Sequence, residues 1–376
     1  RCRLAEQPDA VRDRPVTRAL RRVALLLGVG LLALVAIVIG SAEPPLPLRE
    51  PGDRRVPVAV LGDSDSHGYA DAIWHPVGEA ARGGRYRPVT LQWTEALALL
   101  ARETVDLGEF GVWGCRKTVA AVVEGLGFAR RLPRKQDHRF NFAFAGAHCA
   151  ELHDGSFRQV PRLLALMRED PEAWRRGAVV IRIGVVDLGG AEWGDRMVND
   201  PADARLVARI DACTDAISRA VVAIRAEHAE TAIVLVGLFD NAEAPVYADR
   251  WRSAAAMRNR KLALDRFDDR LRAIAAQDER VSFFDDRAWF RERWGGRDAD
   301  GVPHYRTVAI GAHVVEHRTG DDPCSTALQD GHAGLAVNLL WAQSLARHLA
   351  GLGLAVTPIS DEQVEREFAA RYAALR

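Results

Sequence analysis

A serine follows the first strand that the sequence predicts. Residues 56–61 are apolar and indicate a buried strand, which the sequence Gly-Asp-Ser-Asp-Ser interrupts at residues 62–66. The carboxyl end of such a strand is where α/β proteins bind ligands. The Ser64 hydroxyl is therefore a candidate nucleophile. The alternative is a turn in which Asp63 and Ser64 only cap the next element.

A candidate base lies near the other end of the chain. A serine hydroxyl becomes a good nucleophile only when a base accepts its proton and a third group orients that base. Asp330 precedes His332 by two residues, at the start of an apolar helical pattern. We therefore predict His332 as the base and Asp330 as its orienting group. A surface or helix-capping histidine is the alternative, and His304, His313 and His317 compete for the role.

Two further apolar runs end in residues that suit acyl transfer. Residues 140–147 end in a turn at Gly146, which lets a backbone N–H approach an oxyanion closely. Residues 179–187 run into Asp187 at a second strand end. We predict that the N–H groups of Ser64 and Gly146 form an oxyanion hole. Gly146 as an ordinary strand-ending turn residue is the alternative.

This serial order resembles the SGNH/GDSL hydrolase family over roughly residues 55–350. In that family Gly-Asp-Ser supplies the nucleophile, a second block supplies a glycine N–H, the third reads Gly-x-Asn-Asp, and the last contains Asp-x-x-His. The matching positions here are Gly62 to Ser64, Gly146, residues 184–187, and Asp330 with His332. The resemblance implies a serine esterase that needs no metal or organic cofactor. Its substrate would be a small-molecule or glycan ester.

The third block departs from the family pattern. Val186 stands where the family has an asparagine whose side chain donates to the oxyanion. Losing one such donor costs about 2.7–4 kcal/mol of transition-state stabilisation. Asn241, after another predicted strand, is a candidate replacement. Asp63 and Asp187 are further candidate pocket residues.

The last block is one residue shorter than the family spacing. Asp330-Gly331-His332 is similar to the Asp-x-His pairs of related polysaccharide O-acetyltransferases. If Asp330 cannot reach His332, Asp321 or Asp322 would orient the imidazole instead. Two alternatives to ester hydrolysis therefore stay open: O-acetyl transfer to an envelope glycan, and a catalytically degenerate binding module.

The amino terminus predicts export. Residues 23–40 contain no charge, follow a basic segment (1–22), and precede a Pro-rich linker (41–55). An apolar stretch of this length predicts a transmembrane anchor, and a cleaved signal peptide is the alternative. The basic flank should stay in the cytoplasm, which places residues 56–376 in a periplasm or outside the cell.

Alternating apolar runs and helical patterns define the fold class of residues 56–376. Strands are expected at 56–61, 105–110, 140–145, 179–186, 232–238 and 281–284, and helices at 91–102, 160–167, 204–228, 254–276, 333–350 and 361–375. Such alternation predicts a three-layer α/β/α sandwich around a mainly parallel, flavodoxin-like sheet. Residues 287–330 lack periodicity and predict a long functional loop.

Charge and cysteine content limit the classes of partner. Lys plus Arg equals Asp plus Glu at 51 each, so nucleic-acid binding is not expected. The sequence leaves the oligomeric state open. The cysteines after the anchor, namely Cys115, Cys149, Cys213 and Cys324, would pair in one of three ways in an oxidising compartment, or stay as free thiols.

Overall fold

A parallel five-stranded sheet forms the centre of the molecule. The structure is a computed structural model that describes residues 15–50, 52–75 and 84–375. The strands lie in the order β2-β1-β5-β6-β7. Their bounds are β1 (Val56–Gly62), β2 (Val105–Asp106), β5 (Ala178–Arg182), β6 (Ala232–Val236) and β7 (Val281–Phe284). The predicted α/β fold with a mainly parallel sheet is thereby confirmed.

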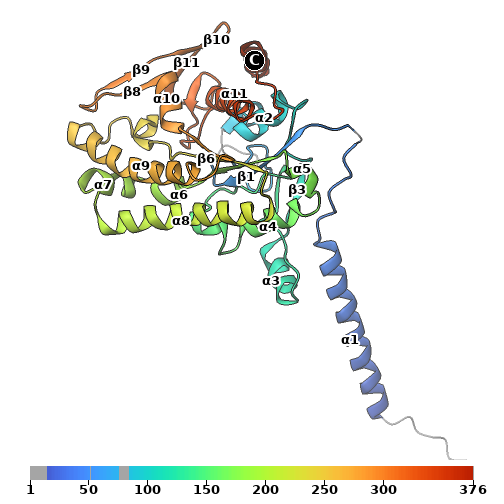
Figure 1. Cartoon of the computed structure of the whole chain (residues 1–376). Helices are drawn as coiled ribbons and strands as arrows, with labels where there is room; N and C mark the ends of the chain where they lie inside the picture. The colour runs from blue at the N-terminus through green and yellow to red at the C-terminus, as the bar shows by residue number, and fades with distance from the viewer. Residues whose placement is uncertain (1–14, 51, 76–83, 376) are drawn as a thin grey trace, which may run out of the picture.

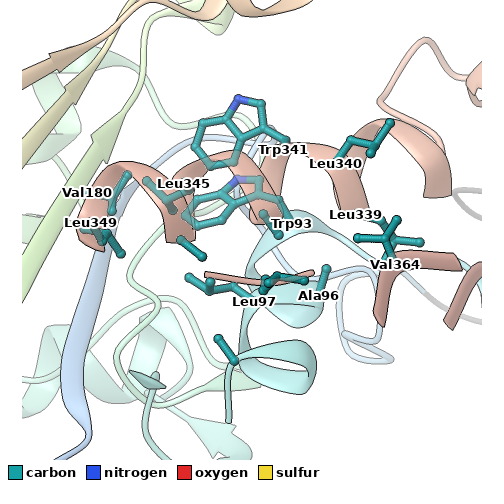
Figure 2. Packing of buried hydrophobic residues seen from close by; sticks show 14 of the residues in the cluster. Trp93, Ala96, Leu97, Val180, Leu339, Leu340, Trp341, Leu345, Leu349 and Val364 are labelled. Atoms are coloured by element: carbon teal, nitrogen blue, oxygen red, sulfur yellow. The ribbon is translucent and has the colours of Figure 1, made fainter. Parts of the chain in front are cut away.

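Helices cover both faces of this sheet because successive strand residues point to opposite sides. Val58 and Val60 of β1 pack in one hydrophobic cluster, and Ala59 and Leu61 in the other. The first cluster contains residues of α2 (Trp93–Leu100), α11 (Leu335–Gly351) and α12 (Asp361–Ala373). Figure 2 shows Trp93 of α2 lying against Trp341 of α11. The second cluster contains residues of α4 (Gln159–Met167), α8 (Ala204–Glu227) and α9 (Ala254–Ala275).

The predicted strands 140–145 and 105–110 do not form continuous strands. Residues 140–144 are extended beside β1, where Phe142 N–H donates to Val60 O and Phe144 N–H to Gly62 O, but they form only an isolated bridge. The predicted strand 105–110 divides into β2 and β3 (Phe110–Trp113), and β3 pairs with β4 (Lys135–His138) in an antiparallel hairpin. Gly108 separates the two with a φ of 77°, a turn that an uninterrupted strand does not contain.

The predicted long loop 287–330 contains regular structure. It holds most of α10 (Asp286–Trp294), followed by β8 (Gly295–Arg297), β9 (Pro303–Tyr305), β10 (Val308–Ile310), β11 (His313–Thr319) and β12 (Ser325–Ala327). β8 pairs with β9, and β10-β11-β12 form a small sheet. These strands are three to seven residues long and mix polar with apolar residues, so they have no continuous apolar run. Figure 1 shows these ribbons above one end of the central sheet.

The remaining elements are short. They are α3 (Lys117–Gly125), α5 (Pro171–Trp174), α6 (Val185–Leu188), α7 (Ala191–Asn199), and the 3-10 helices η1 (Gly84–Val89), η2 (Cys149–Leu152), η3 (Asn241–Glu243) and η4 (Pro245–Tyr247). One disulfide joins Cys149 of η2 to Cys213 of α8, while Cys115 and Cys324 are free thiols. This disulfide is one of the pairings that the sequence allowed.

The amino-terminal helix α1 (Pro15–Gly40) protrudes from the domain (Figure 1). Its segment Leu20–Gly40 is long and apolar enough to cross a membrane. The helix begins at Pro15, within the predicted basic segment 1–22, and continues without a break through the predicted anchor 23–40. Residues 1–14 of the predicted basic segment lie outside the described residues.

The predicted linker 41–55 lies against the domain in its described parts. Leu46 N–H donates to Glu169 at 2.7 Å, and Arg49 forms an ion pair with Asp106 at 3.0 Å. The Glu43 carboxylate accepts the Gly114 N–H at 2.7 Å. These contacts make residues 43–49 part of the domain surface.

Candidate active site

Ser64 lies at the carboxyl end of β1, next to the carboxyl end of β5. These neighbouring strands lead to helices on opposite faces of the sheet, so a ligand site is expected between their ends. A cavity of about 230 Å³ opens at this point, and Ser64 is one of the residues that line it. The strand end predicted from Gly-Asp-Ser therefore presents its serine to a pocket.

Asp63 joins the loop after β1 to the loop after β5. Its carboxylate accepts the N–H groups of Asp65 at 3.1 Å, Gly184 at 3.0 Å and Val185 at 3.2 Å. Burial raises the pKa of Asp63 to about 7, and the nearby Asp65 adds to this shift. Asp63 does not line the cavity. Its role in the structure is to fix the position of the Ser64 loop relative to β5.

Asp330 and His332 line the same cavity as Ser64. Asp330 Oδ1 accepts the His332 N–H at 3.1 Å, and Asp330 Oδ2 lies 3.0 Å from His332 Nδ1. Gly331, with a φ of 85°, makes the turn that folds this carboxylate back onto the ring. The shortened Asp-x-His spacing therefore still brings the carboxylate to the imidazole.

The alternative orienting carboxylates are engaged elsewhere. Asp321 accepts the Gln329 N–H at 3.0 Å, and Asp322 pairs with Arg318 at 2.9 Å. Of the competing histidines, only His317 lines the cavity. His304 pairs with Asp298 on β8–β9, and His313 packs against the rings of Phe368 and Tyr372.

Two donors at the cavity suit an oxyanion. The Ser64 N–H has no acceptor among the described residues, so it is available to a ligand. Asn241 lines the cavity, and its side-chain amide uses one hydrogen to bond Gly189 O at 2.7 Å. Because an amide nitrogen carries two hydrogens, the second N–H is available as well.

Besides Asp63, three positions that the sequence analysis singled out do not line the cavity. Gly146 has a φ of 86° and lies in an exposed turn, and it is not a lining residue. Val185 lines the cavity, whereas Val186 does not. Asp187 faces η2, where it accepts the Cys149 N–H at 2.8 Å, and it pairs with Arg209 at 3.2 Å.

Several lining residues were not predicted from the sequence. The clearest is Arg182, the last residue of β5, which pairs with Asp286 at 3.0 Å and lies over the Trp341 ring. A single charge inside the apolar run 178–183 is a signal that could have identified it. Glu243, Tyr247 and Phe290 come from elements that carried no such signal. Trp289 also lines the cavity, whereas Trp294 is fully buried.

Among the described residues, one cluster has the composition of a metal site. Cys149, Cys213 and Asp187 lie within 4.8 Å of one another, but the two sulfurs are joined in the disulfide. A cysteine binds a metal through its thiolate, and a disulfide sulfur is not a thiolate. The cluster therefore does not fit a metal ion in this oxidation state.

Comparison with known proteins gives no assignment. No protein-family model matches the chain, and no curated protein matches it.

Proposed function

We propose that this chain is a serine hydrolase of the SGNH/GDSL type that cleaves carboxylic esters through an acyl-enzyme. The observation that carries this proposal is the convergence of Ser64 with the Asp330–His332 pair on one cavity, although the two parts lie far apart in the sequence. A nucleophile, a base and an orienting carboxylate in one pocket are the parts that acyl transfer requires.

The mechanism follows from the roles that these groups can take. The Ser64 oxygen attacks the ester carbonyl while His332 Nε2 accepts the hydroxyl proton, which it then gives to the leaving alcohol. Asp330, at Nδ1, favours the tautomer in which Nε2 is unprotonated and can act as the base. The Ser64 N–H and the Asn241 amide stabilise the oxyanion. Water then attacks the acyl-enzyme with His332 again as base, which releases the acid and restores Ser64.

The cavity favours a short acyl group. Its volume of about 230 Å³ is small for a ligand pocket, and it includes apolar side chains of Val185, Val246 and Val337. We therefore expect acetyl or similarly short esters of a small molecule or glycan as substrates.

Activity of the full chain toward p-nitrophenyl acetate tests this proposal. Ser64→Ala should abolish turnover. Ser66→Ala is the matched control, because Ser66 lies in the same loop but accepts from Trp93 Nε1 at 3.2 Å and does not line the cavity. If Ser64→Ala keeps the activity that Ser66→Ala shows, Ser64 is not the nucleophile.

O-acetyl transfer to a glycan is the second candidate, and a neighbouring groove favours it. This groove of about 640 Å³ shares Phe239, Glu243 and Phe290 with the cavity and is lined by charged side chains of both signs. Such a surface suits a hydroxyl-rich acceptor. If an added glycan becomes acetylated while water produces little acetate, transfer replaces hydrolysis as the assigned reaction.

A binding module without turnover is the third candidate, since neither Val185 nor Val186 can donate to an oxyanion through its side chain. If the wild-type chain is inactive on every short ester and Val185→Asn creates activity, this candidate is correct.

We also propose that Leu20–Gly40 anchors the chain in a membrane, with the domain on the non-cytoplasmic side. Arg21 and Arg22 lie at the amino-terminal end of this apolar helix, and basic residues stay on the cytoplasmic side. The Cys149–Cys213 disulfide is typical of an oxidising compartment.

A further inference from the structure

The tip of α3 exposes large apolar side chains beside the amino-terminal helix. We call Val122, Leu126 and Phe128 the α3 tip; each is about half exposed, at 48%, 47% and 50%. Val122 and Leu126 are four residues apart and therefore share one face of the turn that ends α3. Figure 1 shows α3 projecting from the domain on the side where α1 leaves it.

Hydrogen bonds from Arg130 show which part of α1 lies next to this tip. Arg130, two residues after Phe128, donates to Val38 O at 2.7 Å and to Ser41 Oγ at 3.0 Å. In the span Leu20–Gly40, only Leu34 and Val38 are partly covered among residues that are otherwise exposed. Leu34 lies six residues before Gly40, which corresponds to about 9 Å along a helix. The domain therefore contacts α1 inside its apolar segment, up to about 9 Å from the carboxyl-terminal end of that segment.

The length of α1 then places the tip inside a bilayer. The uncharged part of this span, residues 23–40, is about 27 Å long, close to a hydrocarbon core of about 30 Å, and Arg21 and Arg22 lie at its cytoplasmic end. When this span fills the core, the Val38 carbonyl lies near its outer edge. The apolar residues next to Arg130 must then lie at the boundary between headgroups and acyl chains.

A basic hollow lies at the base of the same helix. Its volume is about 500 Å³, and its lining includes Arg116, Lys117, Arg134 and the aromatic rings of Trp74 and Phe157. None of the described residues that line it is acidic. Cationic side chains beside an apolar tip are the composition of surfaces that bind anionic lipid.

We propose that the α3 tip and this basic hollow form a second membrane contact, in which the tip enters the outer leaflet beside α1 and the hollow binds anionic phospholipid headgroups. The contact fixes the domain against the bilayer and so sets the direction in which the active-site cavity faces. This inference rests on the proposed membrane anchor and is independent of the esterase activity.

Photo-crosslinking of the full chain in lipid nanodiscs tests the contact. Benzoylphenylalanine is placed singly at Leu126 or Phe128, and at Leu262 and Val314 as controls that are also exposed and apolar but lie on α9 and β11. A probe at Leu31, inside the span, reports whether α1 is in the bilayer. We expect lipid adducts at Leu31, Leu126 and Phe128 at about tenfold the level of the controls.

The lipid composition separates the two parts of the contact. Adducts at Phe128 should increase when phosphatidylglycerol replaces part of the phosphatidylcholine, and the triple variant Arg116→Ala, Lys117→Ala, Arg134→Ala should remove this increase. Leu126→Asp should lower adduct formation by a probe at Val122.

Three outcomes overturn the inference. Adducts at Leu31 but only control levels at Leu126 and Phe128 would show an anchor without a second contact. No adducts at Leu31 would show that α1 does not lie in the bilayer. Adducts between Phe128 and a second copy of the chain would show a protein interface in place of a lipid one.

Discussion

At His332, the carboxylate of Asp330 is held on the Nδ1 side of the ring by the turn at Gly331. Asp330→Asn keeps this shape but removes the negative charge that favours an imidazolium. By analogy with triads in which such a change disturbs the tautomer, we expect kcat to fall by a factor on the order of a thousand or more, with KM little changed.

The kinetic control for Asp330→Asn is Asp321→Asn. The asparagine side chain that this control introduces can still accept the Gln329 N–H, as Asp321 does. Wild-type kcat in Asp321→Asn and a loss in Asp330→Asn would assign the orienting role to Asp330. Equal kcat values in the two variants would exclude it.

Asn241 tests the replacement of the missing oxyanion donor. Asn241→Ala removes an amide at the cavity, and we expect kcat to fall by roughly a hundredfold or more with KM unchanged. Asn259→Ala is the matched control. Asn259 lies on α9, outside the cavity, and its side-chain amide donates to Val198 O of α7 at 2.7 Å. An unchanged kcat in Asn241→Ala would show that the Asn241 amide does not stabilise the oxyanion.

The residues that could be predicted from the sequence are those with a local signal. Ser64 follows a strand, and Asp330 and His332 are two residues apart, so each pattern is visible in a few letters. Glu243 of η3 and Phe290 of α10 reach the cavity only through tertiary packing, which no local pattern encodes. Gly146 shows the converse, because a strand-end glycine indicated an amide near the cavity, and the structure places it outside the lining.

The small sheet β10-β11-β12 places a histidine against the cavity. Burial lowers the pKa of His317 from 6.5 to about 4. The unfolded chain therefore binds a proton at this residue as the pH falls through about 6.5, while the folded chain does so only near pH 4. His317 should thus lower the free energy of unfolding progressively over this range, by about 3 kcal/mol in total.

Urea unfolding of the full chain in detergent between pH 7 and pH 4 measures this effect. His317→Gln should flatten the decline while keeping a polar group near Thr326, which lies 3.3 Å from His317 Nδ1. His304→Gln, at an exposed ring, is the control. If the free energy of unfolding of His317→Gln falls with pH as steeply as that of the wild type, the pH dependence does not come from His317.

The disulfide between η2 and α8 joins cysteines that are 64 residues apart. Cross-linking of the unfolded chain over this separation contributes about 4 kcal/mol to the free energy of unfolding in the chain-entropy model. The double variant Cys149→Ala, Cys213→Ala should lose most of this stability. Dithiothreitol should lower the free energy of unfolding of the wild type to that of the double variant and leave the double variant unchanged. If dithiothreitol does not change the stability of the wild type, the disulfide is not present.

Helices and strands with strong periodicity were predicted well, and those shaped by tertiary contacts were not. The predicted strand 281–284 coincides with β7, and the helix 204–228 with α8 to within one residue. The predicted strand 179–186 ends at Arg182 because Gly184, with a φ of 131°, turns the chain into α6. The antiparallel ribbons β8 to β11 have strands of only three to seven residues, too few for a periodic signal.

For the whole molecule, alternation of apolar runs and helices was enough to predict a layered fold with a parallel sheet. The strand order β2-β1-β5-β6-β7 explains why Ser64 has a cavity beside it, since β1 and β5 lead to opposite faces. The contacts of α1 with Arg130, and of residues 43–49 with the domain, were not predicted. A Pro-rich segment carries no signal for what it packs against.

The central claim is that His332 activates Ser64, and a fluorophosphonate probe measures this most directly. The probe reacts only with an activated serine, and mass spectrometry of the digested chain locates the adduct. We predict one adduct, on Ser64, whose rate of formation falls by at least about a hundredfold in His332→Gln. An adduct on another residue, or equal labelling of Ser64 in wild type and His332→Gln, would contradict the account.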